Sequence, residues 1–215
     1  MSPYETTSVT VAGERACQDR LAVLEFPDRV VVAVADGAGG SGGGDEAAET
    51  VIREVSAAAS ESHDAESWAK ILGQIDCRIG SGESTCVAAE VSDDGIQGAS
   101  VGDSSAWLVH DGELFDLTRD QIRKPLLGSA AAHPVGFSST FSRGVLILST
   151  DGFSKYVKRE LFLKEVNWLD FSVLARKLVE MVRLPSGQLW DDVSIVACRR
   201  RPTVGRKRYT LSEGD

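Results

Sequence analysis

The stretch from Val30 to Gly44, VVVAVADGAGGSGGG, constrains the fold more than any other part of the chain. Its first six residues are small or β-branched, which is typical of a strand covered on both faces. Asp36 follows at the strand's end, where a carboxylate is costly to bury unless a metal ion or hydrogen-bond donors accompany it. The glycines after it permit positive φ and let backbone carbonyl groups approach an ion. The stretch therefore predicts a strand that delivers one carboxylate into a glycine-rich loop.

Length and charge predict one acidic domain. A chain of 215 residues can bury one substantial core, and its composition is ordinary for a globular protein. The net charge is −9, but residues 199–215 hold six Lys/Arg and two acidic residues, which leaves −13 for the rest. We therefore predict a domain at 1–198 and a basic tail at 199–215 that we expect to be flexible. The negative charge of residues 1–198 disfavours binding of nucleic acid, whereas clustered carboxylates are suitable ligands for divalent cations.

The sequence predicts a cytoplasmic protein with no membrane partner. Its apolar runs fall short of the roughly 20 residues of a membrane-spanning helix, and its first ten residues lack the basic-then-apolar order of a signal peptide. The four cysteines do not have the Cys-x-x-Cys spacing of zinc and redox sites, so we expect reduced thiols.

Hydrophobic periodicity predicts paired strands followed by helices. Strands at 21–26 and 29–35 are joined by a Pro-Asp turn and would bring Asp19 back toward Asp36. Apolar helical stripes are predicted from 45 to 59, from 68 to 79 and from 171 to 182. The remaining predicted strands are 8–12, 83–91, 96–101, 105–110, 113–117, 145–148 and 191–196. Residues 121–144 are rich in Pro, Ser, Gly and Ala and are predicted to form a loop.

Three aspartates, Asp36, Asp151 and Asp191, stand beside predicted strand ends. Each alone is typical of a turn or a helix cap. If their strands are neighbours, however, the carboxylates converge, and mutually repelling carboxylates imply bound cations. Oxygen ligands select Mg²⁺ or Mn²⁺, and two such ions about 3.5–4 Å apart can activate a hydroxide for in-line attack on phosphorus.

Blocks along residues 13–198 resemble, in the expected order, the metal-dependent Ser/Thr protein phosphatases of the type-2C family. The blocks are Gln18-Asp19, Asp36-Gly37-Ala38-Gly39-Gly40, Gly82-Glu83-Ser84-Thr85-Cys86, Gly102-Asp103-Ser104, Leu117-Thr118-Arg119-Asp120, Ser149-Thr150-Asp151-Gly152 and Asp191-Asp192-Val193-Ser194. The resemblance implies one α/β (α+β) domain, a four-layer αββα sandwich of two antiparallel sheets flanked by helices. The predicted order of strands and helices is compatible with that architecture.

The resemblance also implies two Mg²⁺ or Mn²⁺ ions and their ligands. Asp36 would bridge both ions, the Gly37 carbonyl would bind one of them, and Asp151 with Asp191 would bind the other. Asp19 would orient a metal-bound water.

Other implied residues depart from the family pattern. Arg15 would hold the substrate phosphate, but it lies one residue closer to Asp19 than is usual in the family. Asp103, with Asp151, would form the family's weaker third metal site. Ala38 stands where eukaryotic relatives carry a histidine that protonates the leaving group, and His133 is a candidate substitute. The substrate-binding flap is shortened to the loop at 121–144.

The leading hypothesis is a metal-dependent hydrolase of phosphoserine and phosphothreonine in proteins. Its partner would be a phosphoprotein, and it would oppose a Ser/Thr kinase. One alternative is a catalytically weak module that binds phosphoproteins for regulation, which the shifted Arg15 and the short flap favour. Another is a phosphatase of small phosphate esters, which an open site would admit.

Overall fold

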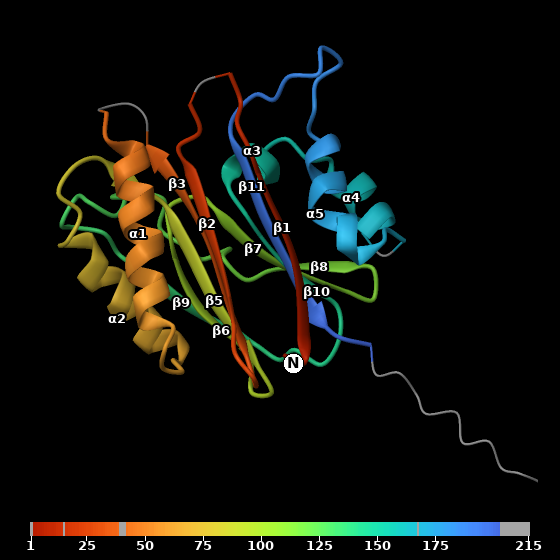
Figure 1. Cartoon of the computed structure of the whole chain (residues 1–215), viewed down its shortest axis with the longest axis horizontal. Helices are drawn as coiled ribbons and strands as arrows, with labels where there is room; N and C mark the ends of the chain where they lie inside the picture. The colour runs from red at the N-terminus through yellow and green to blue at the C-terminus, as the bar shows by residue number, and fades with distance from the viewer. Residues whose placement is uncertain (1, 15, 39–41, 167, 203–215) are drawn as a thin grey trace, which may run out of the picture.

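The computed structural model describes residues 2–14, 16–38, 42–166 and 168–202. Two sheets pack face to face, and helices cover the outer face of each (Figure 1). All strand pairings within the two sheets are antiparallel. The predicted four-layer αββα sandwich is therefore confirmed.

Each sheet combines strands from distant parts of the chain. The five-stranded sheet has the order β1 (Tyr4–Val11), β11 (Val193–Arg200), β10 (Val145–Ser149), β7 (Ser105–His110) and β8 (Glu113–Asp116). The six-stranded sheet has the order β2 (Asp19–Glu25), β3 (Val30–Ala38), β5 (Cys86–Ser92), β6 (Gly95–Val101) and β9 (Val135–Ser139), with β4 (Glu83–Ser84) paired to β3.

The helices divide between the two outer faces, as Figure 1 shows. The six-stranded sheet is covered by α1 (Gly44–Ala58) and α2 (Ala65–Asp76), and the five-stranded sheet by α3 (Asp151–Ser154), α4 (Arg159–Val166), the 3₁₀ helix η1 (Phe171–Val173) and α5 (Leu174–Glu180). In the described part of the chain, no helix is both long enough and apolar enough to cross a bilayer.

Strand β3 has a covered face on each side, as its unbroken apolar run predicts. Val30, Val32 and Val34 belong to the core between the two sheets. The residues that alternate with them, Val31 and Ala33, belong to the core beneath α1 and α2. Because successive side chains of a strand point to opposite faces, no position in this run can be polar without facing a core.

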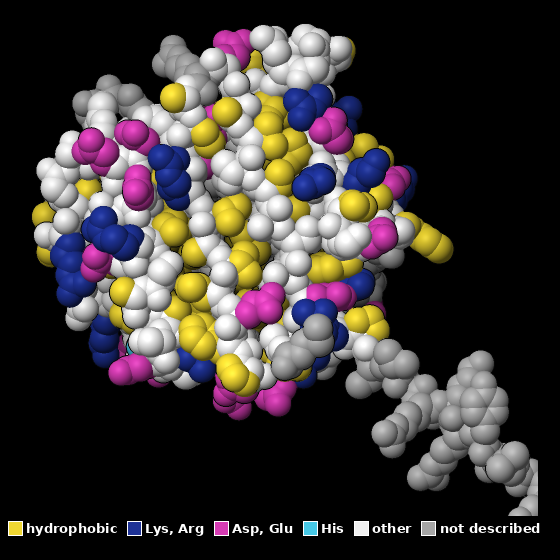
Figure 2. Space-filling model, viewed as in Figure 1, with side chains coloured by type: hydrophobic (Ala, Val, Ile, Leu, Met, Phe, Trp, Pro, Cys, Tyr) yellow, Lys and Arg dark blue, Asp and Glu magenta, His cyan; other side chains and the backbone are white. Residues whose placement is uncertain are grey.

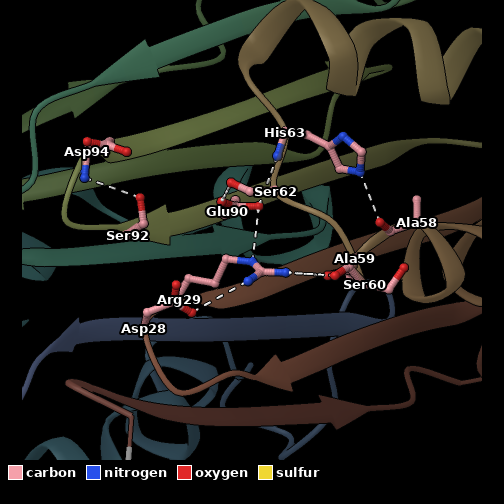
Figure 3. A network of polar contacts seen from close by, with 10 residues as sticks. All are labelled: Asp28, Arg29, Ala58, Ala59, Ser60, Ser62, His63, Glu90, Ser92 and Asp94. Atoms are coloured by element: carbon pink, nitrogen blue, oxygen red, sulfur yellow. Dashed lines mark hydrogen bonds and ion pairs between the residues drawn. The ribbon is translucent and has the colours of Figure 1, made fainter.

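The carboxyl end of α1 is fixed by side chains from two other segments (Figure 3). Arg29, at the turn before β3, donates to the carbonyl oxygens of Ala59 and Ser60, each at 3.1 Å. His63 Nε2 lies 2.9 Å from the carbonyl oxygen of Ala58. Glu90 of β5 is 3.6 Å from Arg29 Nε, so a buried carboxylate balances the charge of the capping guanidinium. These contacts occupy carbonyl groups that a helix end otherwise leaves without partners.

The predicted loop at 121–144 is wrong in one respect, because it contains β9, which pairs with β6 along the sheet edge. The strand is hard to detect in sequence because Phe137 is its one buried side chain. Gly136 packs so closely on the start of α2 that an added Cβ would lie 2.7 Å from the Ala65 carbonyl oxygen. An edge strand with a single apolar anchor gives no readable alternation.

The predictions for the last third of the chain also need correction. The short helices α3 and α4 were not predicted, because α4 buries only Phe162 and Val166 and so lacks a full apolar stripe. The predicted helix at 171–182 is divided into η1 and the shorter α5.

Strand β11 runs two residues past the predicted domain end at 198, and Arg201 N donates to the Pro3 carbonyl. The predicted flexible tail otherwise lies outside the described residues from 203 onward.

Asp76 anchors the turn at residues 128–132. Its side chain is 4 % exposed, and it accepts hydrogen bonds from the backbone N–H groups of Gly128 (2.7 Å), Ala130 (3.0 Å) and Ala132 (2.9 Å). Ala130 has a φ of 56°, in the left-handed region that non-glycine residues rarely adopt. The carboxylate therefore holds a turn that its own sequence does not favour.

We expect Asp76→Ala to lower the free energy of unfolding by about 1.5–3 kcal/mol, because charge-assisted hydrogen bonds to three backbone donors are lost. Asp76→Asn keeps one acceptor oxygen and should cost less. Urea unfolding measures both, with the exposed Asp120→Ala as the control. Equal midpoints for Asp76→Ala and Asp120→Ala would contradict an anchoring role.

Candidate metal centre

The predicted aspartates of the site and Gly37 meet at one end of the sandwich, at the top in Figure 1, where strand ends of both sheets come together. Asp36 and Gly37, near the end of β3, line an open pocket of about 430 Å³ together with Asp191, which precedes β11. Gln18 and Trp190 line the same pocket. Asp19 is paired directly with Asp36 in the β2–β3 hairpin, as predicted from the turn at residues 27–28.

The carboxylates are close enough to raise one another's pKa. Burial, followed by the charges of Asp19 and Asp151, raises the pKa of Asp36 to about 8, and Asp191 and Asp103 add to this effect. Burial also raises the pKa of Asp19 to about 7. The structure thus brings together all five aspartates predicted for the site, from both sheets and from the β6–β7 connection.

Hydroxyl groups of two sequence blocks hold the backbone of Asp36. Thr85 Oγ1 accepts a hydrogen bond from Asp36 N (3.1 Å), and Thr85 N donates to the Asp36 carbonyl (2.8 Å). Ser84 Oγ donates to the same carbonyl at 3.0 Å. Ser104 Oγ, beside Asp103, lies 2.7 Å from Thr85 Oγ1. The blocks at 82–86 and 102–104 therefore support the site without lining its pocket.

A second polar chain joins the two sheets beneath the pocket. Thr150 Oγ1 donates to Asp19 Oδ2 at 2.7 Å and accepts from Ser194 N at 2.9 Å. Asp19 is 2 % exposed, so this hydroxyl is one of few partners available to it. The residue before Asp151 thereby connects β2 of one sheet to β11 of the other.

Asp192 has a role that sequence reasoning missed. Its Oδ1 accepts from Gly13 N (2.8 Å) and its Oδ2 from Gln18 N (2.7 Å), so both oxygens hold the connection between β1 and β2. An asparagine side chain has one carbonyl oxygen and one NH₂ group, so it would not offer a separate acceptor oxygen to each of these two N–H groups. Arg15 belongs to this connection but lies outside the described residues.

Two glycines allow backbone segments to touch at the site. A Cβ on Gly37 would lie 2.1 Å from the Gly44 carbonyl oxygen, where the glycine-rich loop returns to α1. A Cβ on Gly152 would lie 2.0 Å from the Asp192 carbonyl oxygen. Any side chain at either position would displace Asp36 or Asp151, so the Asp-Gly pairs are steric requirements of this packing.

Among the described residues, Lys155 is the one cation in direct contact with these carboxylates, and sequence reasoning did not identify it. Its Nζ contacts Asp151 Oδ2 and lies 3.3 Å from Asp103 Oδ2. Hydrogen bonding to Asp151 raises the pKa of Lys155 further above its ordinary value. The ammonium group therefore stays charged at any physiological pH.

The donor set fits hard divalent cations. Asp36, Asp151 and Asp191 offer carboxylate oxygens, Gly37 offers a carbonyl, and Mg²⁺ and Mn²⁺ prefer oxygen ligands. Because the pKa of Asp36 is raised to about 8, nearby positive charge would favour its ionised form at neutral pH. Among the described residues, no three side chains of Asp, Glu, His or Cys lie close enough together to bind one metal ion as they stand.

A residue that donates a proton to the leaving group is not evident among the described residues. Ala38 occupies the histidine position of eukaryotic relatives. His133 is exposed and does not line the pocket.

The sequence profile of the protein phosphatase 2C family matches residues 10–185. The chain belongs to this family. Its members are metal-dependent hydrolases of phosphoserine and phosphothreonine in proteins, so the predicted family and enzyme class are confirmed. No curated protein sequence matches the chain significantly.

Solved structures share the fold at low identity. Stp1 from Staphylococcus aureus, a serine/threonine phosphatase, has a TM-score of 0.78 at 19% identity, covering 92% of this chain and 95% of its own. The S. agalactiae serine/threonine phosphatase has a TM-score of 0.77 at 16% identity, covering 92% and 100%. The PPM Ser-Thr phosphatase MsPP from Mycobacterium smegmatis, in complex with cacodylate, has a TM-score of 0.74 at 20% identity, covering 92% and 98%.

The raised pKa values predict the pH dependence of the chelated protein. In the folded state Asp19 and Asp36 hold protons up to about pH 7 and 8, whereas in the unfolded chain they lose them near 3.8. The folded state binds more protons within this window, so the free energy of unfolding falls as pH rises from about 4 to about 8.

We expect Asp36→Asn to raise the Tm of the chelated protein at pH 8, by about 2–4 °C for each kcal/mol of repulsion removed. The variant should also flatten the dependence of Tm on pH. Thermal unfolding in EDTA between pH 5 and pH 8 tests this, with the exposed Asp120→Asn as the control. A lower Tm for Asp36→Asn at pH 8 would refute the repulsion argument.

Proposed function

We propose that this chain removes phosphate from phosphoserine or phosphothreonine in proteins at the Asp36 pocket, with two Mg²⁺ or Mn²⁺ ions. The convergence of carboxylates from both sheets on one open pocket is the observation that carries this proposal. Bound divalent ions supply Lewis acidity, which activates water and offsets charge on the phosphoryl group.

The residues have distinct proposed roles. The carboxylates of Asp36, Asp151 and Asp191 and the carbonyl of Gly37 would hold the two ions, which would supply Lewis acidity at the pocket. Asp19, held by Thr150, would orient the attacking water. Asp19 is buried and hydrogen-bonded to Thr150, so its side chain has a fixed position beside Asp36.

Arg15 is proposed to hold the substrate phosphate. Support comes from the connection on which it lies, because Asp192 fixes that connection at Gly13 and at Gln18. Its guanidinium can present two parallel donors to a phosphate, which a lysine cannot do. If Arg15 does not reach the phosphate, Arg119, Arg123 and Lys124 are the cations to test next.

A peptide substrate is favoured over a small phosphate ester by an aromatic pair at the pocket. Trp190 lines the pocket and is 65 % exposed, and it stacks on Tyr156, which is 43 % exposed, with 6.2 Å between ring centroids. Exposed aromatic side chains beside a polar site are typical of surfaces that bind protein partners. Peptide residues next to the phosphorylated one can contact this pair, which compensates for the short flap.

The proposed partner is a phosphoprotein that a Ser/Thr kinase modifies, and cytoplasmic location stays a prediction. The exclusion of nucleic acid also stays a prediction. On the described part of the face in Figure 2, Lys and Arg side chains alternate with Asp and Glu and form no continuous basic patch.

We expect turnover of an aryl phosphate to require Mg²⁺ or Mn²⁺ and to stop on addition of EDTA. Asp191→Asn should lower kcat by more than about 100-fold, since loss of a partner outside the ligand shell already costs up to that factor in metal sites. Asp191 is exposed, so circular dichroism should show an intact fold. Activity that survives chelation, or a wild-type rate in Asp191→Asn with Asp120→Asn as control, would exclude the proposed mechanism.

We expect Arg15→Ala to raise KM for a phosphopeptide by roughly 10–100-fold, equivalent to the 1.5–3 kcal/mol of hydrogen bonds to a charged group. Metal affinity should be unchanged, because the contact is to substrate. Arg15→Lys should restore part of the loss. An unchanged KM in Arg15→Ala would transfer the role to Arg119, Arg123 or Lys124, to be tested by the same substitutions.

A further inference from the structure

Lys155 lies where two carboxylates from different parts of the fold meet. Asp103 is in the connection from β6 to β7, and Asp151 begins α3 after β10. The ammonium group of Lys155 contacts Oδ2 of Asp151 and lies 3.3 Å from Oδ2 of Asp103. The single positive charge of Lys155 is therefore shared by two carboxylates.

The position of this ammonium group is set by helical geometry. Lys155 follows Asp151 by four residues, which is one turn of helix, and its backbone N–H donates to the Asp151 carbonyl at 3.0 Å. Side chains four residues apart lie on the same face of a helix. Lys155 thus reaches Asp151 without any rearrangement of a loop.

Asp103 is also held in place. The connection passes through Gly102, which has a φ of 96°, and a Cβ at that position would lie 2.6 Å from Thr85 Cγ2. On its other side, Ser104 contacts Thr85. The fold therefore fixes the backbone positions from which the Asp103 and Asp151 carboxylates reach Lys155.

We propose that Lys155 takes the place of the weaker third cation, so that this chain binds two divalent ions and supplies the third positive charge itself. The inference rests on the proposed function, because it concerns the neighbour of the two-ion site. It also corrects the role expected for Asp103, which becomes the partner of a lysine rather than a metal ligand.

Electrostatic repulsion supports the proposal that Lys155 excludes a third ion. A divalent ion between Asp103 and Asp151 would lie against the ammonium group, and the two positive charges would repel each other. The Lys155 ammonium donates hydrogen bonds to the same oxygens that the ion would need. In this arrangement Asp36, Asp191 and the second oxygen of Asp151 would be available to the two ions, whereas Asp103 pairs with Lys155.

An ordinary surface ion pair is the competing interpretation, because the Lys155 side chain is 49 % exposed. Exposed pairs contribute little to stability. That interpretation predicts no effect of Lys155 on the number of bound ions, so counting ions separates the two.

The test is the Mn²⁺ stoichiometry of the full chain, measured by equilibrium dialysis with metal analysis as free Mn²⁺ is raised into the millimolar range. We expect two ions for the wild type and three for Lys155→Met, which keeps the apolar stem but removes the charge. The matched control is Lys158→Met, an exposed lysine three residues further on, which should bind two. The double variant Lys155→Met with Asp103→Asn should return to two, because the third site then lacks a ligand.

Each outcome has one meaning. Three ions in the wild type, or two in a folded Lys155→Met, would overturn the inference. If Lys155→Met does not fold, Lys155→Gln takes its place, and the wild-type count alone still decides whether a third ion binds. A wild type that binds no Mn²⁺ would instead refute the proposed function, so the two failures are distinguishable.

Discussion

The carboxylates gathered at one end of the sandwich repel one another. Asp36 is the most affected, since its pKa is raised to about 8 by burial and by its neighbours. A fold that gathers such groups loses stability unless positive charge is supplied. Nearby contacts serve to hold the acids together: hydroxyl groups fix the backbone of Asp36, Thr150 binds Asp19, and Lys155 joins Asp151 to Asp103.

The site requires both sheets, so its geometry is a consequence of how they pack. Asp19 and Asp36 belong to the six-stranded sheet, whereas Asp151 and Asp191 flank strands of the five-stranded sheet. The apolar residues between the sheets, such as Val32, set the distance between these pairs. Close packing resists small changes of spacing, so a cavity in this core would loosen the metal centre as well as the fold.

Sequence reasoning predicted correctly those elements that have a regular apolar pattern or a recognisable turn. The double-covered strand β3 was readable because every residue from 30 to 35 is apolar, and Asp19 was placed opposite Asp36 by a two-residue turn. The edge strand β9 was not readable, because its stability comes from pairing with β6 rather than from its own side chains. Lys155 was missed for a related reason: one lysine after a short helix has the pattern of a surface residue, and only the fold brings Asp103 beside it.

Asp192 links the connection between β1 and β2 to the candidate metal centre. It follows the proposed ligand Asp191 directly, and its two oxygens hold the backbone at Gly13 and Gln18. A displacement of Asp191 on metal binding would therefore move the ends of the connection that carries Arg15. Because an asparagine accepts through one oxygen only, the aspartate in this chain makes that coupling tighter. The same substitution adds a negative charge beside the cluster, which increases the need for the positive charge that Lys155 provides.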